Sequence, residues 1–170
     1  MSIIIRKANQ EDIPALAKIK VDGWKDAYQG IVDEDFLESL TYDTQINRFN
    51  DGEDSPCGIV AIDEKKGEVV GFSTFGKRKD LSKGFPKYDC ELHSIYISSD
   101  RKGEGIGRKL LKEVLKQQKV SGYNKMLLWC FKENIDTIEF YKRTGGVLLG
   151  EKEIEIEKMR FVQIGFGYEL

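Results

Sequence analysis

The stretch Ile97-Ser-Ser-Asp-Arg-Lys-Gly-Glu-Gly-Ile-Gly-Arg-Lys-Leu-Leu111 decides the fold of this chain. An apolar run at residues 92–97 leads into a basic turn with glycine at every second position, and an amphipathic helix follows directly. The glycines let successive backbone N–H groups point outward together, and the first helical turn adds unpaired donors and the positive end of the helix dipole. The stretch therefore predicts a phosphate or pyrophosphate site at residues 102–108.

The glycine pattern does not fit the common nucleotide-binding loops. A Walker loop, Gly-x-x-x-x-Gly-Lys-Ser/Thr, is found nowhere in the chain. In the Rossmann pattern Gly-x-Gly-x-x-Gly, the last place counted from Gly103 is Arg108, and counted from Gly105 it is Leu110. A glycine-rich turn without a ligand stays as an alternative, because such turns also connect strands to helices.

A second segment supports a ligand site. Residues 126–131, Met-Leu-Leu-Trp-Cys-Phe, have the composition of a short strand, and Asn134-Ile-Asp-Thr-Ile-Glu-Phe-Tyr-Lys-Arg-Thr-Gly-Gly146 follows. Asn134 is a favourable helix N-cap, and Gly145 or Gly146 supplies a left-handed C-terminal stop. We therefore expect a strand followed by a helix.

Together, in this order, the two segments resemble the GNAT acetyltransferase superfamily. Its first motif commonly reads Arg/Gln-Gly-x-Gly-x-Gly/Ala, and residues 102–107 read Lys-Gly-Glu-Gly-Ile-Gly. Its second motif commonly reads Asn-x-x-Ala-x-x-Phe-Tyr-x-x-x-Gly-Phe, and its matching residues here are Asn134, Phe140, Tyr141 and Gly145. The chain departs from these motifs at three positions: Lys102 stands in place of Arg or Gln, Thr137 in place of Ala, and Gly146 in place of Phe.

Strands and helices alternate along the chain without a linker or repeat, which predicts a single domain over residues 1–170. The expected strands are 2–7, 57–63, 68–76, 88–97, 126–131 and a C-terminal hairpin around 153–157 and 162–170. The expected helices are 9–28, 33–40, 44–49, 105–119 and one beginning at residue 134. These elements predict an α/β or α+β fold with a mixed, mostly antiparallel central sheet and helices on both faces. The order is that of the GNAT fold.

The composition is that of an ordinary globular protein. Hydrophobic residues make up 40% and charged residues 33%, and 27 Lys and Arg nearly balance 29 Asp and Glu. This balance argues against a general nucleic-acid binder, although basic residues gather at the turn: Arg101, Lys102, Arg108, Lys109 and Lys112. Three scattered cysteines form no metal or disulfide framework, and no apolar run approaches the ~20 residues of a membrane span. We expect a cytoplasmic protein without metal, nucleic-acid or membrane partners.

The resemblance implies acetyl transfer from acetyl-CoA to an amine. The backbone donors expected to hold the pyrophosphate are those of Lys102, Gly103, Glu104, Gly105, Ile106, Gly107 and Arg108. Main-chain groups of Ile95, Tyr96 and Ile97 would pair with the pantetheine amides, and the Ile95 N–H would polarise the thioester carbonyl. Tyr141 is the family's general acid for the leaving thiolate, or an ordinary core aromatic. Asn134 would orient the pantetheine or a water.

The attacking amine also needs a base, because an ammonium has no free electron pair. Glu91 and His93, at spacing two on one strand, share a face. Glu91 is the first choice, since related enzymes use an acid near this place; His93 is an alternative base, a substrate contact or an ordinary imidazole. Trp24 and Tyr28 are expected to line the acceptor pocket. The acids at 33–35 either attract a cationic amine or stabilise the N-terminus of a helix through its dipole.

Three functions follow. The leading prediction is an acetyl-CoA-dependent N-acetyltransferase that acts on a primary amine of a small molecule or peptide in a ternary complex. A regulatory or sensor domain that binds acyl-CoA without turnover is the second, and retention of Asn134 and Tyr141 argues against it. The third is an interaction protein that pairs through an exposed C-terminal strand, which leaves the glycine turn unexplained. A homodimer is compatible with catalysis, because members of the family often pair.

Overall fold

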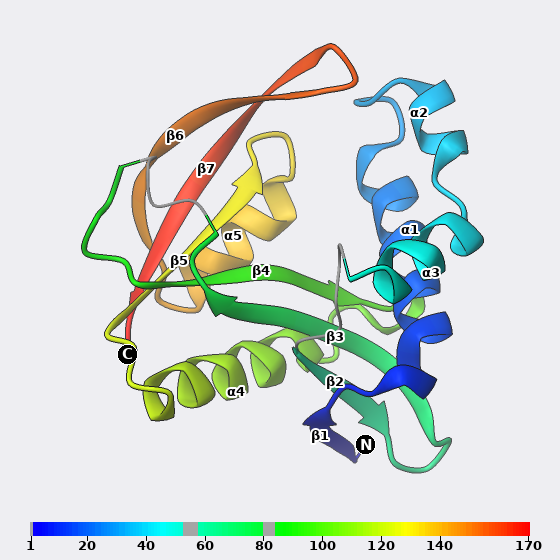
Figure 1. Cartoon of the computed structure of the whole chain (residues 1–170), viewed down its shortest axis with the longest axis horizontal. Helices are drawn as coiled ribbons and strands as arrows, with labels where there is room; N and C mark the ends of the chain where they lie inside the picture. Colours follow the sequence, from blue (N-terminus) through cyan, green and yellow to red (C-terminus); the bar gives the residue numbers. More distant parts are fainter. Residues whose placement is uncertain (1, 53–57, 80–83) are drawn as a thin grey trace. The chain divides into compact units, whose positions relative to one another are not determined.

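The computed structural model describes residues 2–52, 58–79 and 84–170. Its strands are β1 (Ile3–Lys7), β2 (Gly58–Asp63), β3 (Glu68–Lys77), β4 (Cys90–Ile97), β5 (Lys125–Phe131), β6 (Val147–Ile156) and β7 (Met159–Glu169). They pair in the order β1-β2-β3-β4-β5-β7-β6 (Figure 1). β4 and β5 run parallel, whereas β1·β2, β2·β3, β5·β7 and β6·β7 are antiparallel. The predicted mixed, mostly antiparallel sheet is confirmed.

The helices lie where the sequence predicts them, with ends displaced by a few residues. They are α1 (Ile13–Tyr28), α2 (Glu34–Ser39), α3 (Tyr42–Asn50), α4 (Ile106–Val120) and α5 (Ile135–Arg143), with short 3-10 segments η1 (Gln10–Asp12) and η2 (Ser99–Arg101). Within the described residues, no helix is both long and apolar enough to cross a membrane.

The chain forms two compact units. The first consists of Met1–Thr74 and Ser94–Glu113, and the second of Phe75–His93 and Val114–Leu170. β3, β4 and α4 each contribute residues to both units. The predicted site residues are therefore divided between two units.

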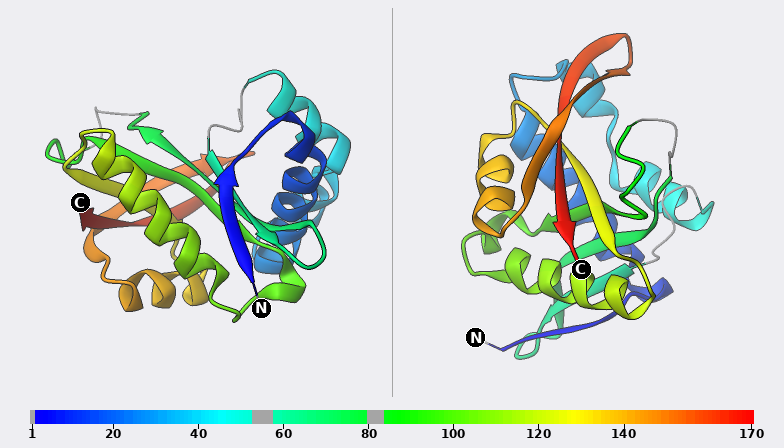
Figure 2. Two further views of the ribbon diagram at one scale, coloured as in Figure 1. Left: turned by 90° about the horizontal axis from the view of Figure 1, so that it is seen from below. Right: turned by 90° about the vertical axis from the view of Figure 1, so that its left-hand side faces the viewer.

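In the first unit, helices cover both faces of the strands. Phe72 of β3 is buried in a cluster with Leu16 of α1 and Phe49 of α3, and α1 and α3 lie side by side (Figures 1 and 2). The neighbouring Gly71 points to the opposite face. A Cβ there would lie 3.3 Å from Cγ2 of Ile106 at the start of α4. The prediction of helices on both faces is confirmed in this unit.

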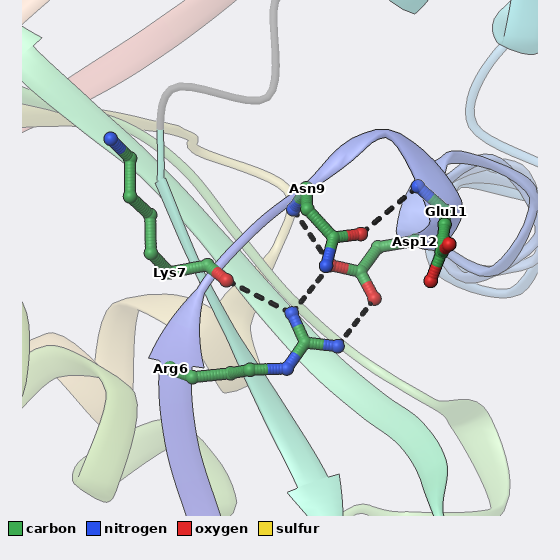
Figure 3. A network of polar contacts seen from close by, with 5 residues as sticks. All are labelled: Arg6, Lys7, Asn9, Glu11 and Asp12. Atoms are coloured by element: carbon green, nitrogen blue, oxygen red, sulfur yellow. Dashed lines mark hydrogen bonds and ion pairs between the residues drawn. The ribbon is translucent and has the colours of Figure 1, made fainter.

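A polar network fixes the start of the first helical segment (Figure 3). Oδ1 of Asn9 accepts the Glu11 N–H, and the Asp12 carboxylate accepts the Asn9 N–H at 2.8 Å, which completes a capping box. Arg6 on β1 donates to both Asp12 oxygens at 2.8 Å each. The hydrogen bonds from Arg6 hold the pKa of Asp12 below its usual range, although burial opposes this. Asn9 thus caps the start of the helical segment that the sequence predicts at residues 9–28.

Of two predicted strand starts, one lies outside the described residues and the other is displaced by two residues. Residue 57, the expected start of one strand, lies outside the described residues, and the strand is described from Gly58 onward. β4 is expected from residue 88 but begins at Cys90. The Tyr88 N–H donates to the Phe85 carbonyl in a turn, at 3.0 Å. The Asp89 carboxylate accepts hydrogen bonds from the backbone N–H groups of residues 124 and 125, so Asp89 connects the start of β4 to the start of β5.

The C-terminal strand is not an exposed edge, so that expectation is wrong. β7 lies between β5 and β6, and its Phe166 pairs with Leu128 on one side and Leu148 on the other. Figures 1 and 2 show β6 and β7 as a paired ribbon along their length. Because both neighbours satisfy the main chain of β7, the edge strand at this end of the sheet is β6.

A buried arginine organises the connection between β3 and β4 in the second unit. The Arg78 guanidinium donates to the carbonyls of Gly84 and Phe85 at 2.8 Å each, and the residue is 4% exposed. Phe85 has φ +54°, a left-handed conformation that non-glycine residues rarely adopt. Its ring centroid lies 6.4 Å from that of Tyr88 and 6.2 Å from that of Trp129. The Phe85 ring therefore contacts Tyr88, which precedes β4, and Trp129 of β5.

Candidate active site

The glycine turn has the backbone conformation that its sequence predicts. Gly103 and Gly105 have φ of +83° and +79°, and nothing lies within 4 Å of a Cβ built at either residue. Glycine is therefore needed here for the left-handed backbone and not for close packing. The open space above both residues leaves the turn accessible to a ligand.

The start of α4 supplies the hydrogen-bond donors of the turn. A backbone hydrogen bond joins the Lys109 N–H to the Gly105 carbonyl at 3.1 Å. The N–H groups of Ile106, Gly107 and Arg108 belong to the first turn, where donors lack intrahelical acceptors. The Ile106 side chain is 1% exposed and anchors the helix in the core. This end of α4 can hold an anion with its main chain.

Arg101 does not face outward with the other basic residues of the turn. Its Nε lies 3.0 and 2.9 Å from the two carboxylate oxygens of Glu104, and its Nη1 lies 3.0 Å from Oδ2 of Asp63. Asp63, at the end of β2, is absent from the predicted site. No local pattern indicates it, because it is 38 residues from Arg101 in the sequence.

The expected pantetheine edge belongs to the second half of β4. The parallel ladder with β5 comprises the pairs Cys90↔Met126, Glu91↔Leu127 and Leu92↔Leu128. Ile95, Tyr96 and Ile97 lie beyond these pairs, so within the described residues their main chain is not part of that ladder. The pairing of these residues with the pantetheine arm, which the resemblance implies, stays a prediction.

The predicted acceptor residues Trp24 and Tyr28 belong to an aromatic group in the first unit. Their ring centroids are 4.7 Å apart, and Trp24 lies 6.1 Å from Phe36. The Trp24 indole N–H donates to the Tyr96 hydroxyl at 3.0 Å. Gly23 allows this contact, because a Cβ there would be only 3.3 Å from the Tyr96 ring. The sequence predicts a role for Tyr96 only through its backbone and indicates none for Phe36.

In the second unit, Asn134 caps the start of α5 and Tyr141 lies on that helix. The Asn134 side chain accepts the Thr137 N–H at 3.3 Å, as predicted for an N-cap. Tyr141 is 4% exposed, and its ring centroid lies 5.8 Å from that of Phe166. Its carbonyl accepts the Tyr168 hydroxyl at 3.2 Å. Helix and strand thus hold Tyr141 in one position.

The departure from the second motif at residue 146 has a steric cause. A Cβ at Gly146 would lie 2.9 Å from both the Tyr141 carbonyl oxygen and the Tyr168 hydroxyl. Such distances are shorter than real Cβ contacts, so the Phe of the family motif cannot occupy this backbone beside Tyr168.

Glu91 and His93 share one face of β4 as the spacing predicts. Nδ1 of His93 lies 3.9 Å from the Glu91 carboxylate, and the two side chains are 16% and 18% exposed. Nδ1 makes no hydrogen bond within the described part of the chain. Burial, with a contribution from the charge of Lys79, lowers the pKa of His93 to about 4. His93 is therefore neutral at neutral pH.

An aromatic side chain that the sequence pattern does not indicate lies on the same face. Glu91 pairs with Leu127, so Trp129, two residues further along β5, points to the same face. Nζ of Lys152 lies 4.2 Å from the Trp129 ring centroid, in a cation–π contact. A Cβ at Gly165 would lie 2.9 Å from this ring, which explains a glycine in a strand.

Each unit brings together its own part of the predicted site. The first unit holds the aromatic acceptor wall, residues 95–97 and the glycine turn 102–108. The second holds the pair Glu91 and His93, with Asn134 and Tyr141 on α5. The predicted roles of these residues in binding and catalysis stay predictions.

Comparison with known proteins places this geometry in a family. The family model for the acetyltransferase (GNAT) family matches residues 21–146. The uncharacterized N-acetyltransferase YuaI of Bacillus subtilis is 32% identical over 166 residues, which are 98% of this chain and 92% of that protein. A spermidine N(1)-acetyltransferase of Thermoplasma acidophilum is 25% identical over 150 residues, which are 85% and 88% of the two chains.

A solved structure agrees in fold. The crystal structure of the PaiA N-acetyltransferase of Thermoplasma acidophilum, in complex with coenzyme A, superposes with a TM-score of 0.68 at 22% identity and covers 100% of both chains. At 22% identity, this structural similarity establishes the fold. The family is established by the family model, which matches most of the sequence. The chain therefore belongs to the acetyltransferase (GNAT) family, and it is an acetyl-CoA-dependent N-acetyltransferase.

Proposed function

We propose that the enzyme acetylates a primary amine of a small molecule or peptide by direct attack within a ternary complex. The observation that carries this proposal is the glycine turn, whose left-handed Gly103 and Gly105 open onto the donors of α4. The relative named spermidine N(1)-acetyltransferase supports a small amine as acceptor. In this proposal the turn binds the pyrophosphate of acetyl-CoA, and residues 95–97 pair with its pantetheine arm.

Acetyl-CoA supplies the acetyl group as a thioester, whose C–S bond breaks as the C–N bond to the amine forms. Glu91 accepts a proton from the acceptor ammonium, which frees the electron pair of the nitrogen. The Ile95 N–H donates a hydrogen bond to the developing oxyanion. Tyr141 donates its phenolic proton to the leaving sulfur, and Asn134 orients the pantetheine or a water near it. After the attack the nitrogen loses a second proton, which restores the phenol of Tyr141 by way of water, and the proton held by Glu91 is released to solvent.

Glu91 is the better candidate for the base because of the environment of His93. An ordinary imidazole has a pKa near 6.5, which suits a base at neutral pH. Burial lowers the pKa of His93 to about 4, so its basicity is no greater than that of an ordinary carboxylate. We therefore assign His93 to the acceptor side, where it lies beside the Glu91 carboxylate at 3.9 Å.

We also propose that aromatic side chains select the acceptor. Trp24 and Tyr28 form one wall together with Phe36 and the Tyr96 ring. These rings favour an acceptor with an apolar or cationic portion next to the amine. The acids at 33–35 lie at the start of α2, where the helix dipole accounts for them.

A titration calorimetry experiment with acetyl-CoA and with unacylated CoA tests the proposal first. We expect binding in about the micromolar range for both ligands. Amines are then screened for thiol release, with spermidine, free amino acids and an N-terminal peptide amine as representatives of three classes. Failure to bind either form of CoA would contradict the proposal. Binding without turnover on any amine would favour the sensor hypothesis.

A homodimer is also part of the proposal. The edge strand β6 exposes Val147 and Leu148 at 63% and 60%. Further along the strand, Glu153 and Glu155 are exposed and would oppose their counterparts in a second copy. Contact is therefore favoured at the Val147 end. Light scattering should give a mass of two chains, and substitution of Leu148 by Lys should reduce it to one.

A further inference from the structure

The turn proposed to bind pyrophosphate contains an acid. Glu104 lies between the two left-handed residues Gly103 and Gly105, next to the donors of α4. An unpaired carboxylate at this place would repel a bound pyrophosphate, because like charges a few ångströms apart oppose each other. An anion site with this sequence therefore requires that the charge of Glu104 be compensated.

Arg101 provides the compensation. Its Nε contacts both Glu104 carboxylate oxygens, at 3.0 and 2.9 Å. The Arg101 side chain is 11% exposed and that of Glu104 is 34% exposed. The pair is less hydrated than an ordinary surface ion pair, so its electrostatic interaction is less screened by solvent.

Asp63 in turn holds Arg101. Nη1 of Arg101 lies 3.0 Å from Oδ2 of Asp63, while Oδ1 of Asp63 accepts the Lys65 N–H at 3.0 Å. The Asp63 side chain is 8% exposed. Burial alone would raise the pKa of Asp63, but hydrogen bonds from Arg101 and the backbone hold it below its usual range. The end of β2 thus fixes the guanidinium in the orientation that meets Glu104.

We propose that Arg101 is a positioning residue for cofactor binding, which pairs with Glu104 and keeps that carboxylate from opposing the pyrophosphate of acetyl-CoA. Arg101 acts through Glu104 and is not itself a ligand of the cofactor. Asp63 is the anchor that keeps the guanidinium in place. This inference rests on the proposed role of the glycine turn.

A double-mutant cycle on CoA affinity separates this electrostatic role from a purely structural one. Arg101→Gln should weaken CoA binding about tenfold, because it leaves Glu104 uncompensated. The double variant Arg101→Gln with Glu104→Gln should bind within about threefold of the wild type, since the opposing charge is gone. If Arg101 served only to hold the turn, removal of Glu104 would restore nothing.

Glu104→Gln alone provides a second test. It changes one partly exposed side chain and therefore perturbs the fold little. It should bind CoA at least as tightly as the wild type, because the carboxylate beside the turn is gone while Arg101 keeps its contact with Asp63. Weaker binding by Glu104→Gln would overturn the proposal, as would a double variant that binds as weakly as Arg101→Gln. The deficit of Arg101→Gln should also shrink as salt is raised, since salt screens the repulsion.

Arg6→Gln is the matched control. Arg6, like Arg101, donates to both oxygens of one carboxylate, here that of Asp12 at 2.8 Å each, but it lies outside the turn (Figure 3). Arg6→Gln should lower the melting temperature without altering CoA affinity. Wild-type protein that fails to bind CoA would refute the proposed function itself. Wild-type binding with an unimpaired Arg101→Gln variant would refute the role of Arg101 alone.

Discussion

The Tyr141 hydroxyl is a single group on which the proposed chemistry depends. Tyr141→Phe keeps the ring packed on Phe166 but removes the proton donor. We expect turnover to fall about 10²-fold to 10³-fold with unchanged CoA affinity, in line with the usual contribution of a general acid. Steady-state rates and calorimetry check this. A large loss of affinity with normal turnover would contradict the assignment.

Tyr168→Phe is the matched control for this substitution. The Tyr168 hydroxyl contacts Thr144 at 2.9 Å and the Tyr141 carbonyl at 3.2 Å. Its loss should reduce the free energy of unfolding by about 1–2 kcal/mol, because it removes partners of buried polar groups. Turnover should stay near that of the wild type. A similar loss of turnover in both variants would indicate that packing, and not proton donation, is being measured.

His93 connects burial with the acid stability of the protein. Its pKa is about 4 in the folded protein, against an ordinary value of 6.5. Between these two pH values the unfolded chain binds more protons, so stability must decrease as the pH falls. We expect this residue to contribute a loss of about 3 kcal/mol between pH 7 and pH 4, at 1.36 kcal/mol per pKa unit. Urea unfolding at several pH values measures it.

His93→Gln isolates this contribution from that of the carboxylates. The variant should be less sensitive to pH between 7 and 4 than the wild type, because it has no imidazole to protonate. Equal pH dependence in the two proteins would contradict the lowered pKa. The geometry of this residue was predictable from the spacing with Glu91, whereas its pKa was not, since burial arises from distant segments.

At the scale of the element, the glycine turn before α4 is specified by local sequence. Gly105→Val places a β-branched residue at φ +79°, and it should abolish CoA binding because the turn must rearrange. Gly122→Val is the control, since Gly122 has φ +91°, with open space around it, in the turn after the other end of α4. It should destabilise the protein and leave CoA affinity unchanged. Equal binding by Gly105→Val and the wild type would contradict the pyrophosphate assignment.

The elements also show why some of the site was predictable and some was not. Positive φ at Gly103 and the N-cap at Asn134 follow from local propensities, so the sequence indicates both. The contact of Arg101 with Asp63 depends on how β2 meets the turn, and the pattern of either segment alone does not reveal it. The pairing of Trp129 with Gly165 likewise depends on the register of β5 and β7.

At the scale of the whole molecule, the sequence predicts one domain, while the contacts divide the chain into two units. β3, β4 and α4 each contribute residues to both units, so the chain passes from one unit to the other within these elements. We therefore expect a single cooperative unfolding transition. The chain has two tryptophans, Trp24 in the first unit and Trp129 in the second, which allows each unit to be observed separately.

Two single-tryptophan variants carry out this measurement. Trp129→Phe leaves the fluorescence of the first unit, and Trp24→Phe leaves that of the second. In urea, the fluorescence transition of each variant should coincide with its own transition followed by far-UV circular dichroism. Separated transitions within one variant would show that the units unfold independently and would overturn the prediction of one domain.

The glycine at residue 146 constrains the order in which this sequence can change. The hydroxyl of Tyr168 and the carbonyl of Tyr141 occupy the space that any side chain at 146 would need. A lineage that replaces Gly146 by the family's Phe while Tyr168 is present passes through a strained intermediate. Loss of the Tyr168 hydroxyl relieves one of the two contacts, and the end of α5 must shift to relieve the contact with the Tyr141 carbonyl. The two positions are therefore sterically coupled, although 22 residues separate them in the sequence.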